Sequence, residues 1–247
     1  MIAVWELIIL EPILNVLIAL SQILFGQFGL AIIALTVIVR LISWPLNKRQ
    51  LKATKAMQDM QPKMQELQKK YGKNQQKLQQ ETMKLYKEAG VNPLGCLWPM
   101  LIQLPIWIAL YQSIMRALAA TPENLLNLHR HLYSWEIVHQ AIPLSSRFLW
   151  LDLSRPDPYF ILAIIVGGTM WVQQKMTTAP SVDPKQQSTA RMMTVMMPFM
   201  FGILTLMFPS GLALFWAVSN VIGIVSQYVF AGGWGYLKLS SPFQPRS

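Results

Sequence analysis

The sequence predicts an all-α polytopic membrane protein with five transmembrane helices, a cytoplasmic helical hairpin and an N-terminal interfacial helix. Of its 247 residues, 53% are hydrophobic and 13% are charged, whereas about 25% are charged in an ordinary soluble domain. Uncharged runs of membrane-spanning length recur along the chain, and basic residues collect between them. This composition excludes an average soluble globule and a disordered charged tail. The single cysteine, Cys96, excludes an internal disulfide.

The N-terminal segment, residues 1–28, is apolar but interrupted by Glu6, Glu11, Pro12 and Asn15. It lacks the basic start and the small-residue cleavage site of a signal peptide. We expect an amphipathic helix on the outer interface. The alternative is a sixth span, which would place the N-terminus inside without a basic residue to hold it there.

Five later stretches are long and apolar enough to cross a membrane. From Met192 to Tyr236 no residue is charged, which is about twice the length of one span, and Pro209-Ser210-Gly211 marks a turn in the middle. The expected spans are 29–46, 93–118, 158–176, 192–208 and 210–231.

The distribution of Lys and Arg predicts the orientation, because these residues accumulate on the cytoplasmic side. Residues 47–92 hold eleven Lys or Arg and four Asp or Glu, whereas residues 119–157 hold three basic and four acidic residues. We therefore expect the N-terminus outside, an outer loop at 119–157, a cytoplasmic loop at 177–191 and a cytoplasmic tail at 232–247.

The basic segment 47–92 has the pattern of two helices. Apolar residues recur at helical spacing from Met57 to Tyr71, Gly72 breaks the run, and a weaker series follows. This predicts a cytoplasmic helical hairpin, with Pro62 as a site for a kink in the first arm. Its bases fit the orientation signal and anionic lipid, or ribosomal RNA phosphates. Sequence-specific nucleic-acid binding is not expected because no recognition motif accompanies the charges.

A polar stripe runs along the first expected span. Thr36, Arg40 and Ser43 are spaced by four and three residues, so they share one helix face. An arginine inside a span should face protein or water because lipid penalises it. Further polar or aromatic candidates occur in the other spans, at Gln103, Gln173, Gln174, Trp216 and Asn220. These faces either enclose a wet cavity that opens to the cytoplasm, or Arg40 extends to the headgroups while the amides bond between helices.

No catalytic or metal-binding pattern is evident. The three histidines, His129, His131 and His139, all fall in the expected outer loop without a zinc-binding framework. No phosphate-binding loop of nucleotide-driven motors occurs. The sequence therefore predicts neither an enzyme nor a cofactor nor a metal site.

Several motifs, in order along residues 29–230, resemble the bacterial YidC branch of the YidC/Oxa/Alb membrane insertases. The most telling segments are Thr36-Val37-Ile38-Val39-Arg40-Leu41, Asn92-Pro93-Leu94-Gly95-Cys96, Gln103-Leu104-Pro105-Ile106, Phe148-Leu149-Trp150-Leu151-Asp152-Leu153, and Pro209-Ser210-Gly211-Leu212 through Phe215-Trp216 to Ser219-Asn220. The sequence is similar to a short form of the family, without the large outer domain of many Gram-negative members.

The resemblance implies an insertase of the bacterial inner membrane that uses a hydrophilic groove open to the cytoplasm, without ATP hydrolysis. It implies nascent membrane proteins and lipid as partners, with the ribosome and the Sec translocon as further ones. Arg40 and Thr36 match groove positions, and Phe215 and Trp216 match an aromatic pair at which substrate is contacted, with Phe215 where tyrosine is usual. Two alternatives stay open from the residues alone: a small anion transporter that uses Arg40, and a scaffold for assembling membrane complexes.

Overall fold

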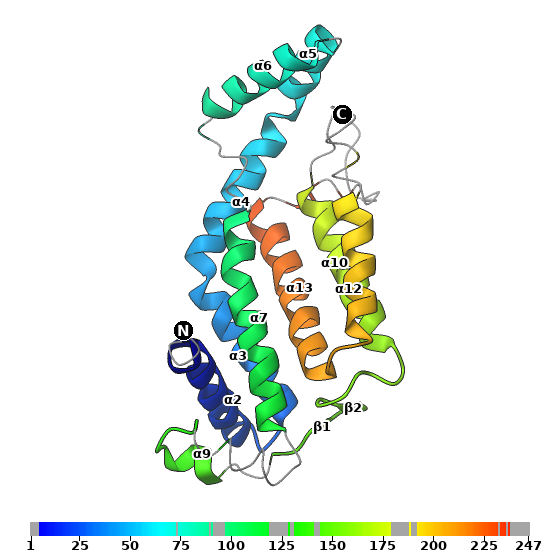
Figure 1. Ribbon diagram of the computed structural model, residues 1–247. Coiled ribbons are helices and arrows are strands. Elements are labelled where there is room, and N and C mark those ends of the chain that lie inside the picture. Colours follow the sequence, from blue (N-terminus) through cyan, green and yellow to red (C-terminus); the bar gives the residue numbers. More distant parts are fainter. Residues whose placement is uncertain are drawn as a thin grey trace.

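The computed structural model describes residues 5–72, 74–88, 90, 97–118, 128, 131–140, 144–178, 188, 192–231, 233–235 and 237. These residues form a largely helical bundle (Figure 1). Helices α5 (Gln61–Tyr71) and α6 (Gln75–Glu88) project from one end, here called the hairpin end. The short strands β1 (Arg147–Phe148) and β2 (Leu151–Asp152) lie at the opposite end, the strand end. The 92–96 motif, His129, most of the 177–191 loop and most of the 232–247 tail lie outside the described residues.

The N-terminal segment forms one helix of 18 residues, long and apolar enough to cross a membrane. It consists of a π-helical turn, η1 (Glu6–Leu10), followed by α2 (Glu11–Ile23). The wider turn directly precedes Pro12, whose ring clashes with the carbonyl four residues earlier in a regular helix. Helix α2 packs against α3 and α7 through buried residues that include Leu14 and Ile18.

Asn15 is buried within this packing, although the sequence pattern treated it as an interruption of an interfacial helix. Its amide nitrogen donates to the carbonyl of His131 at 2.8 Å, and its amide oxygen accepts from the Tyr133 amide at 2.7 Å. The nearby helix α9 (Glu136–Gln140) also packs on α2. Asn15 therefore fastens the segment that follows α7 onto the N-terminal helix.

The stretch expected as the first span is bent. Helix α3 (Phe28–Ile42) ends four residues before the expected limit, and α4 (Trp44–Asp59) continues at an angle of 59°. Pro45 explains the position of the bend, because it has no N–H to donate and its ring displaces the carbonyl of Leu41. A second break at Met60 precedes α5, so the site expected to kink at Pro62 is instead the start of a new helix.

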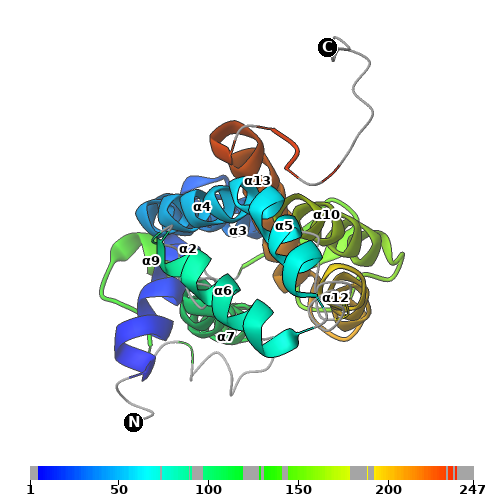
Figure 2. The same cartoon turned by 90° about the horizontal axis from the view of Figure 1, so that it is seen from above.

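Helix α13 (Ser210–Ala231) is central to the bundle and covers the residues of the fifth expected span. It packs against α3, α7 (Leu97–Ala117) and α10 (Ile161–Thr177), as Figure 2 shows from above. Its segment Ser210–Phe230 is the second described helix that is long and apolar enough to cross a membrane, and the bent pair α3 and α4 would be a third if it forms one span.

Helix α10 also packs against α12 (Met197–Thr205) and the π-helical turn η3 (Met192–Met196) before it. This turn again comes shortly before a proline, Pro198. Gly167 and Gly202 let the two helices approach closely, since a Cβ on Gly167 would lie 3.4 Å from the Pro198 carbonyl oxygen. Helix α12 ends at Thr205, before the expected limit at residue 208.

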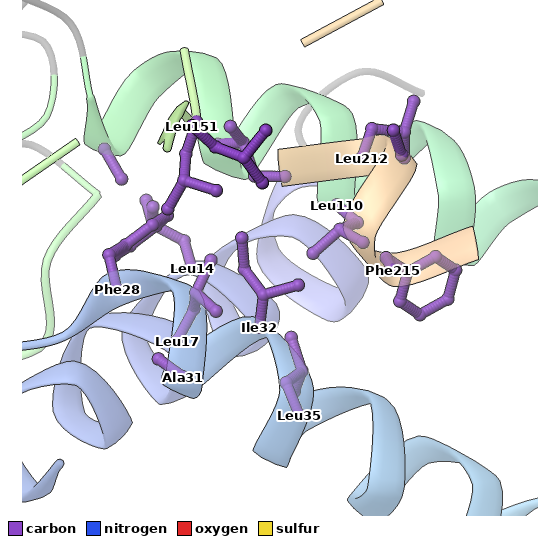
Figure 3. Close-up of a cluster of buried hydrophobic side chains, with 14 of the residues drawn as sticks. Leu14, Leu17, Phe28, Ala31, Ile32, Leu35, Leu110, Leu151, Leu212 and Phe215 are labelled. Carbon is purple, nitrogen blue, oxygen red and sulfur yellow. The ribbon is translucent and has the colours of Figure 1, made fainter. Parts of the chain in front are cut away.

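The hydrophobic core fills the half of the bundle nearer the strand end. Figure 3 shows side chains from α2, α3, α7, β2 and α13 pointing toward one another in this core. Among them are Leu14, Ile32, Leu110, Leu151 and Phe215, all buried. Their packing joins the N-terminal helix to the rest of the bundle.

The segment after β2 closes the start of α13. The amide of Ser210 donates to the Arg155 carbonyl at 2.7 Å, and its hydroxyl donates to the Asp152 carbonyl at 2.7 Å. The amide of Gly211 donates to the Leu153 carbonyl at 3.1 Å. These bonds satisfy helix-start amides that have no partner within the helix. The loop that begins with the 148–153 motif is thereby bonded to the Pro209-Ser210-Gly211 motif at the start of α13.

The Asp152 carboxylate accepts hydrogen bonds from Ser154 within the same loop. Burial favours its neutral form, but the amide and the hydroxyl of Ser154 both donate to it, at 3.1 and 2.7 Å, and Arg155 lies nearby. The balance lowers the pKa of Asp152 below its ordinary value of 3.8.

Candidate polar site around helix α13

The guanidinium of Arg40 reaches from α3 to the backbone of α13. Its Nη2 donates to the carbonyl oxygen of Ser219 at 2.8 Å, while its Nε is buried and has no hydrogen-bond partner. Within the described part of the chain, no carboxylate lies within ion-pair distance of Arg40. A guanidinium carries five N–H donors, and among the described residues one carbonyl accepts from Arg40 while its Nε has no partner.

Two further contacts join α10 to α13, a hydrogen bond and the packing of an amide on a glycine. The amide nitrogen of Asn220 donates to the Thr169 hydroxyl at 3.2 Å. One turn further along, the Gln173 amide lies directly against Gly223, in space that a Cβ on that glycine would occupy. Gln173 is thus placed at the α10–α13 contact, and the absence of a side chain at residue 223 makes room for its amide.

The aromatic pair occupies the interior of the bundle. Phe215 is buried in the core near Leu110. The Trp216 ring makes edge-on contacts with Trp107 of α7, Phe201 of α12 and Phe208, with centroids 5.4 to 5.9 Å apart. Its indole N–H is buried without a partner, although a buried tryptophan usually donates to an acceptor.

For the remaining site residues expected from the sequence, the described structure shows no hydrogen bond to α13. The buried Thr36 hydroxyl donates to the Ile32 carbonyl of its own helix at 2.7 Å, so this donor is already used. Ser43 lies at the end of α3, where the helix bends. Gln103, one turn before Trp107, and Gln174, beside Gln173, are half-buried.

Several buried polar atoms near α13 lack hydrogen-bond partners in the described structure, and we call them the unpaired polar set: Arg40 Nε, Trp216 Nε1, Ser219 Oγ and both amide atoms of Gln227. Gln227 is 1% exposed. Buried polar groups in proteins are nearly always hydrogen-bonded, so each exception needs an explanation. Water or a polar ligand between the helices would supply the missing partners.

The sequence already places Gln227 on this face, because it follows Trp216, Asn220 and Gly223 at helical spacing. The side-chain pattern does not mark Ser219 as a site residue. Ser219 contributes a backbone carbonyl to Arg40, and a side-chain pattern carries no information about backbone acceptors.

No cluster of three or more potential metal ligands occurs within the described residues. Of the two described histidines, His131 lies 3.8 Å from Glu6, which also accepts from Arg116 at 2.9 Å. This contact joins the N-terminal helix to the end of α7, away from the unpaired polar set.

The chain is similar to known membrane proteins over most of its length. It matches the family described as 60Kd inner membrane protein over residues 20–233. It is 40% identical over 230 residues to the membrane protein insertase YidC of Actinobacillus succinogenes and, over the same length, to that of Histophilus somni. Each match covers 93% of this chain, and the chain spans 38% of the length of each relative.

A solved structure supports the same relationship. The crystal structure of an active YidC insertase, with its first transmembrane domain resolved, matches with a TM-score of 0.57 at 30% identity. The match covers 84% of this chain and 43% of that one. Together with the apolar helices, these matches show that the chain belongs to the 60Kd inner membrane protein family, the YidC branch of the YidC/Oxa/Alb insertases, and is a multi-pass protein of the inner membrane.

Proposed function

We propose that this protein inserts nascent membrane proteins into the lipid bilayer, and that the unpaired polar set receives their polar segments. The relatives named as membrane protein insertases support the activity. The unpaired polar set supports the site, because it offers donors and acceptors that the fold itself leaves without partners. The action is non-catalytic and uses no ATP.

The observation that carries this proposal is that, among the described residues, the guanidinium of Arg40 donates to one carbonyl and its Nε is left without a partner. Even on a lenient scale, an arginine at the centre of a membrane helix costs about 2.5 kcal/mol. Among the described residues, a single backbone carbonyl accepts from this arginine and no carboxylate neutralises it. A positive charge held in this way attracts water and the acidic or polar segments of a polypeptide. It is therefore better placed to bind a passing substrate than to form a permanent ion pair within the fold.

The free energy of transferring the substrate into lipid is then sufficient for insertion without ATP hydrolysis. Each Leu, Ile or Phe of a substrate gains about 0.3–0.6 kcal/mol at the centre of the bilayer, so about 20 such residues outweigh the transfer of a short polar tail. A membrane potential that is positive outside adds about 2.3 kcal/mol per 100 mV for each acidic charge that moves outward.

In the proposed orientation, the hairpin end faces the cytoplasm and the strand end faces outward. The lysines of α5 and α6, exposed at the hairpin end, support this assignment. Their position also suits recruitment of a ribosome or a Sec translocon, whereas the interlocked loop at the strand end closes the outer side of the site.

The test is insertion into proteoliposomes that contain the purified full chain, with a single-span substrate that has an acidic N-terminal tail. Arg40→Ala should lower insertion at least tenfold, and Arg40→Lys should largely preserve it, because the positive charge is retained. Arg147→Ala, which removes an exposed arginine from β1, serves as the control. Full activity of Arg40→Ala would refute the role of this charge.

Two further measurements separate this proposal from other functions. A photo-crosslinker at residue 216, which leaves Arg40 in place, should capture a ribosome-bound nascent chain. Anion flux through the same liposomes without any insertion would indicate a transporter instead. Insertion that proceeds equally well without the protein, with only complex assembly impaired, would indicate a scaffold.

A further inference from the structure

Three large apolar side chains at the strand end stand on left-handed backbone. Phe25, Leu149 and Phe160 have φ angles of 59°, 55° and 58°, and among the described residues they are the only ones other than glycine with positive φ. Large side chains rarely adopt this conformation, because the Cβ approaches the backbone. Such strain persists only where something compensates for it.

Each of these positions is one where glycine would fit without strain. Phe25 follows α2, and the next amide, of Gly26, donates to the Ser21 carbonyl at 2.8 Å. In this helix-ending motif the left-handed position is usually glycine. Leu149 is the first residue of the two-residue turn between β1 and β2, and positive φ at that position is the pattern of a type II′ turn, which also favours glycine. Phe160 immediately precedes α10.

These three side chains are mostly exposed, so they contribute little to packing within the described fold. Phe25 is 92% exposed, Leu149 is 76% exposed and Phe160 is 57% exposed. The adjacent strand residue Leu151 is buried in the core, so the turn presents Leu149 outward while its neighbour holds the strands in place. Compensation for the strain must therefore come from outside the described chain.

We propose that Phe25, Leu149 and Phe160 insert into the lipid leaflet on the strand side of the bundle and fix how deeply this end sits in the membrane. The apolar surface at Phe160 continues into Ile161, Ile164 and Ile165, which are exposed on α10. These isoleucines belong to the surface that a multi-pass protein presents to lipid.

The flanking residues favour a lipid headgroup region over water. Trp150 and Tyr159, next to the two loop residues, are exposed, and such aromatic side chains are enriched where lipid meets water. Arg147 and Arg155 are exposed in the same loop, and long basic side chains can extend from this depth to lipid phosphates. Figure 1 places β1, β2 and the start of α10 together at this end.

The test uses nitroxide labels on single cysteines in a Cys96→Ser background of the full chain, in nanodiscs of phosphatidylethanolamine and phosphatidylglycerol. Labels at residues 25, 149 and 160 are compared for collisions with oxygen, which concentrates in lipid, and with a water-soluble nickel chelate. Ile164→Cys provides the lipid reference, and Lys84→Cys, exposed on α6, provides the water reference. Ratios near the residue 164 value support the proposal. Ratios near the residue 84 value overturn it, as does shielding from both reagents, which would indicate a protein partner.

A second measurement separates insertion from a structural role. The triple variant Phe25→Gly, Leu149→Gly and Phe160→Gly relieves the strain, so its Tm in detergent should be at least that of the unaltered protein. The increase in Tm on transfer from detergent to lipid nanodiscs should fall by half or more, because the inserted side chains are gone. An unchanged increase would overturn the proposal.

Discussion

The contact between Gly29 and Phe148 gives the sharpest test of how the strand end is built. Gly29 lies in the first turn of α3, and the Phe148 ring of β1 packs directly on it. A Cβ on Gly29 would fall 2.5 Å from both Cδ atoms of the ring, so Gly29→Ala forces the ring to move. Overpacking of this kind costs about 1–3 kcal/mol. The higher helix propensity of alanine returns about 1 kcal/mol, so we expect a net loss of about 0–2 kcal/mol.

A double-mutant cycle isolates this contact. Phe148→Ala alone should also destabilise the protein, but by less than the ~3–5 kcal/mol lost when a fully buried phenylalanine is truncated, because the ring is only half-buried. In the double variant the new methyl group enters space that the ring has left. The two losses should therefore sum to about 1–3 kcal/mol more than the double variant loses, which is the cost of the overpacking itself.

The free energy of unfolding would be measured by denaturant titration in mixed micelles. Gly168→Ala is the matched control, because a Cβ on this α10 glycine meets no atom within 4 Å. It should be neutral or stabilise by up to about 1 kcal/mol. If Gly29→Ala behaves like this control, or if the cycle is additive, the inferred packing of the strand end is wrong.

Three further predictions concern polar contacts. Asn15→Leu leaves the partly buried Tyr133 amide without its acceptor, which should cost about 1–3 kcal/mol and increase protease cleavage between α7 and α9. Because folding lowers the pKa of Asp152, its contribution to stability should be complete above pH 3.8 and be lost as the pH falls below that value, and Asp152→Asn should flatten this dependence in a plot of Tm against pH. Asn220→Leu combined with Thr169→Val should show a coupling of about 0.6 kcal/mol in unfolding titrations, whereas zero coupling would mean that this contact between α10 and α13 is not made.

Sequence analysis succeeded where the signal is local. The long uncharged run with Pro209-Ser210-Gly211 at its centre indicated where α13 begins, and the break at Gly72 marks the end of α5. The helical character of the chain and its family could be predicted in the same way. Periodicity also placed Arg40 and Asn220 on faces that meet the interior, because 3.6 residues per turn fixes which side chains share a face.

Contacts between distant residues could not be predicted from the sequence. Asn15 resembled an interruption of an apolar helix, and its partners are more than one hundred residues away. The acceptor of Arg40 is a backbone carbonyl, which no residue pattern marks. Trp216 fits a groove position in the family pattern, but its ring is enclosed by aromatic neighbours from α7 and α12.

The 59° bend between α3 and α4 lies at the base of the long helix that carries α5 and α6, so a small change in the angle produces a large displacement of these helices. Helix α4 has 16 residues, so its far end lies about 24 Å from the bend at about 1.5 Å per residue. Opening or closing the angle by about 10° would swing α5 and α6 through about 4 Å, roughly the width of a peptide backbone, without disturbing any residue of the core. Pro45, at the start of α4, thus marks the point about which such a swing would carry α5 and α6 relative to the rest of the bundle.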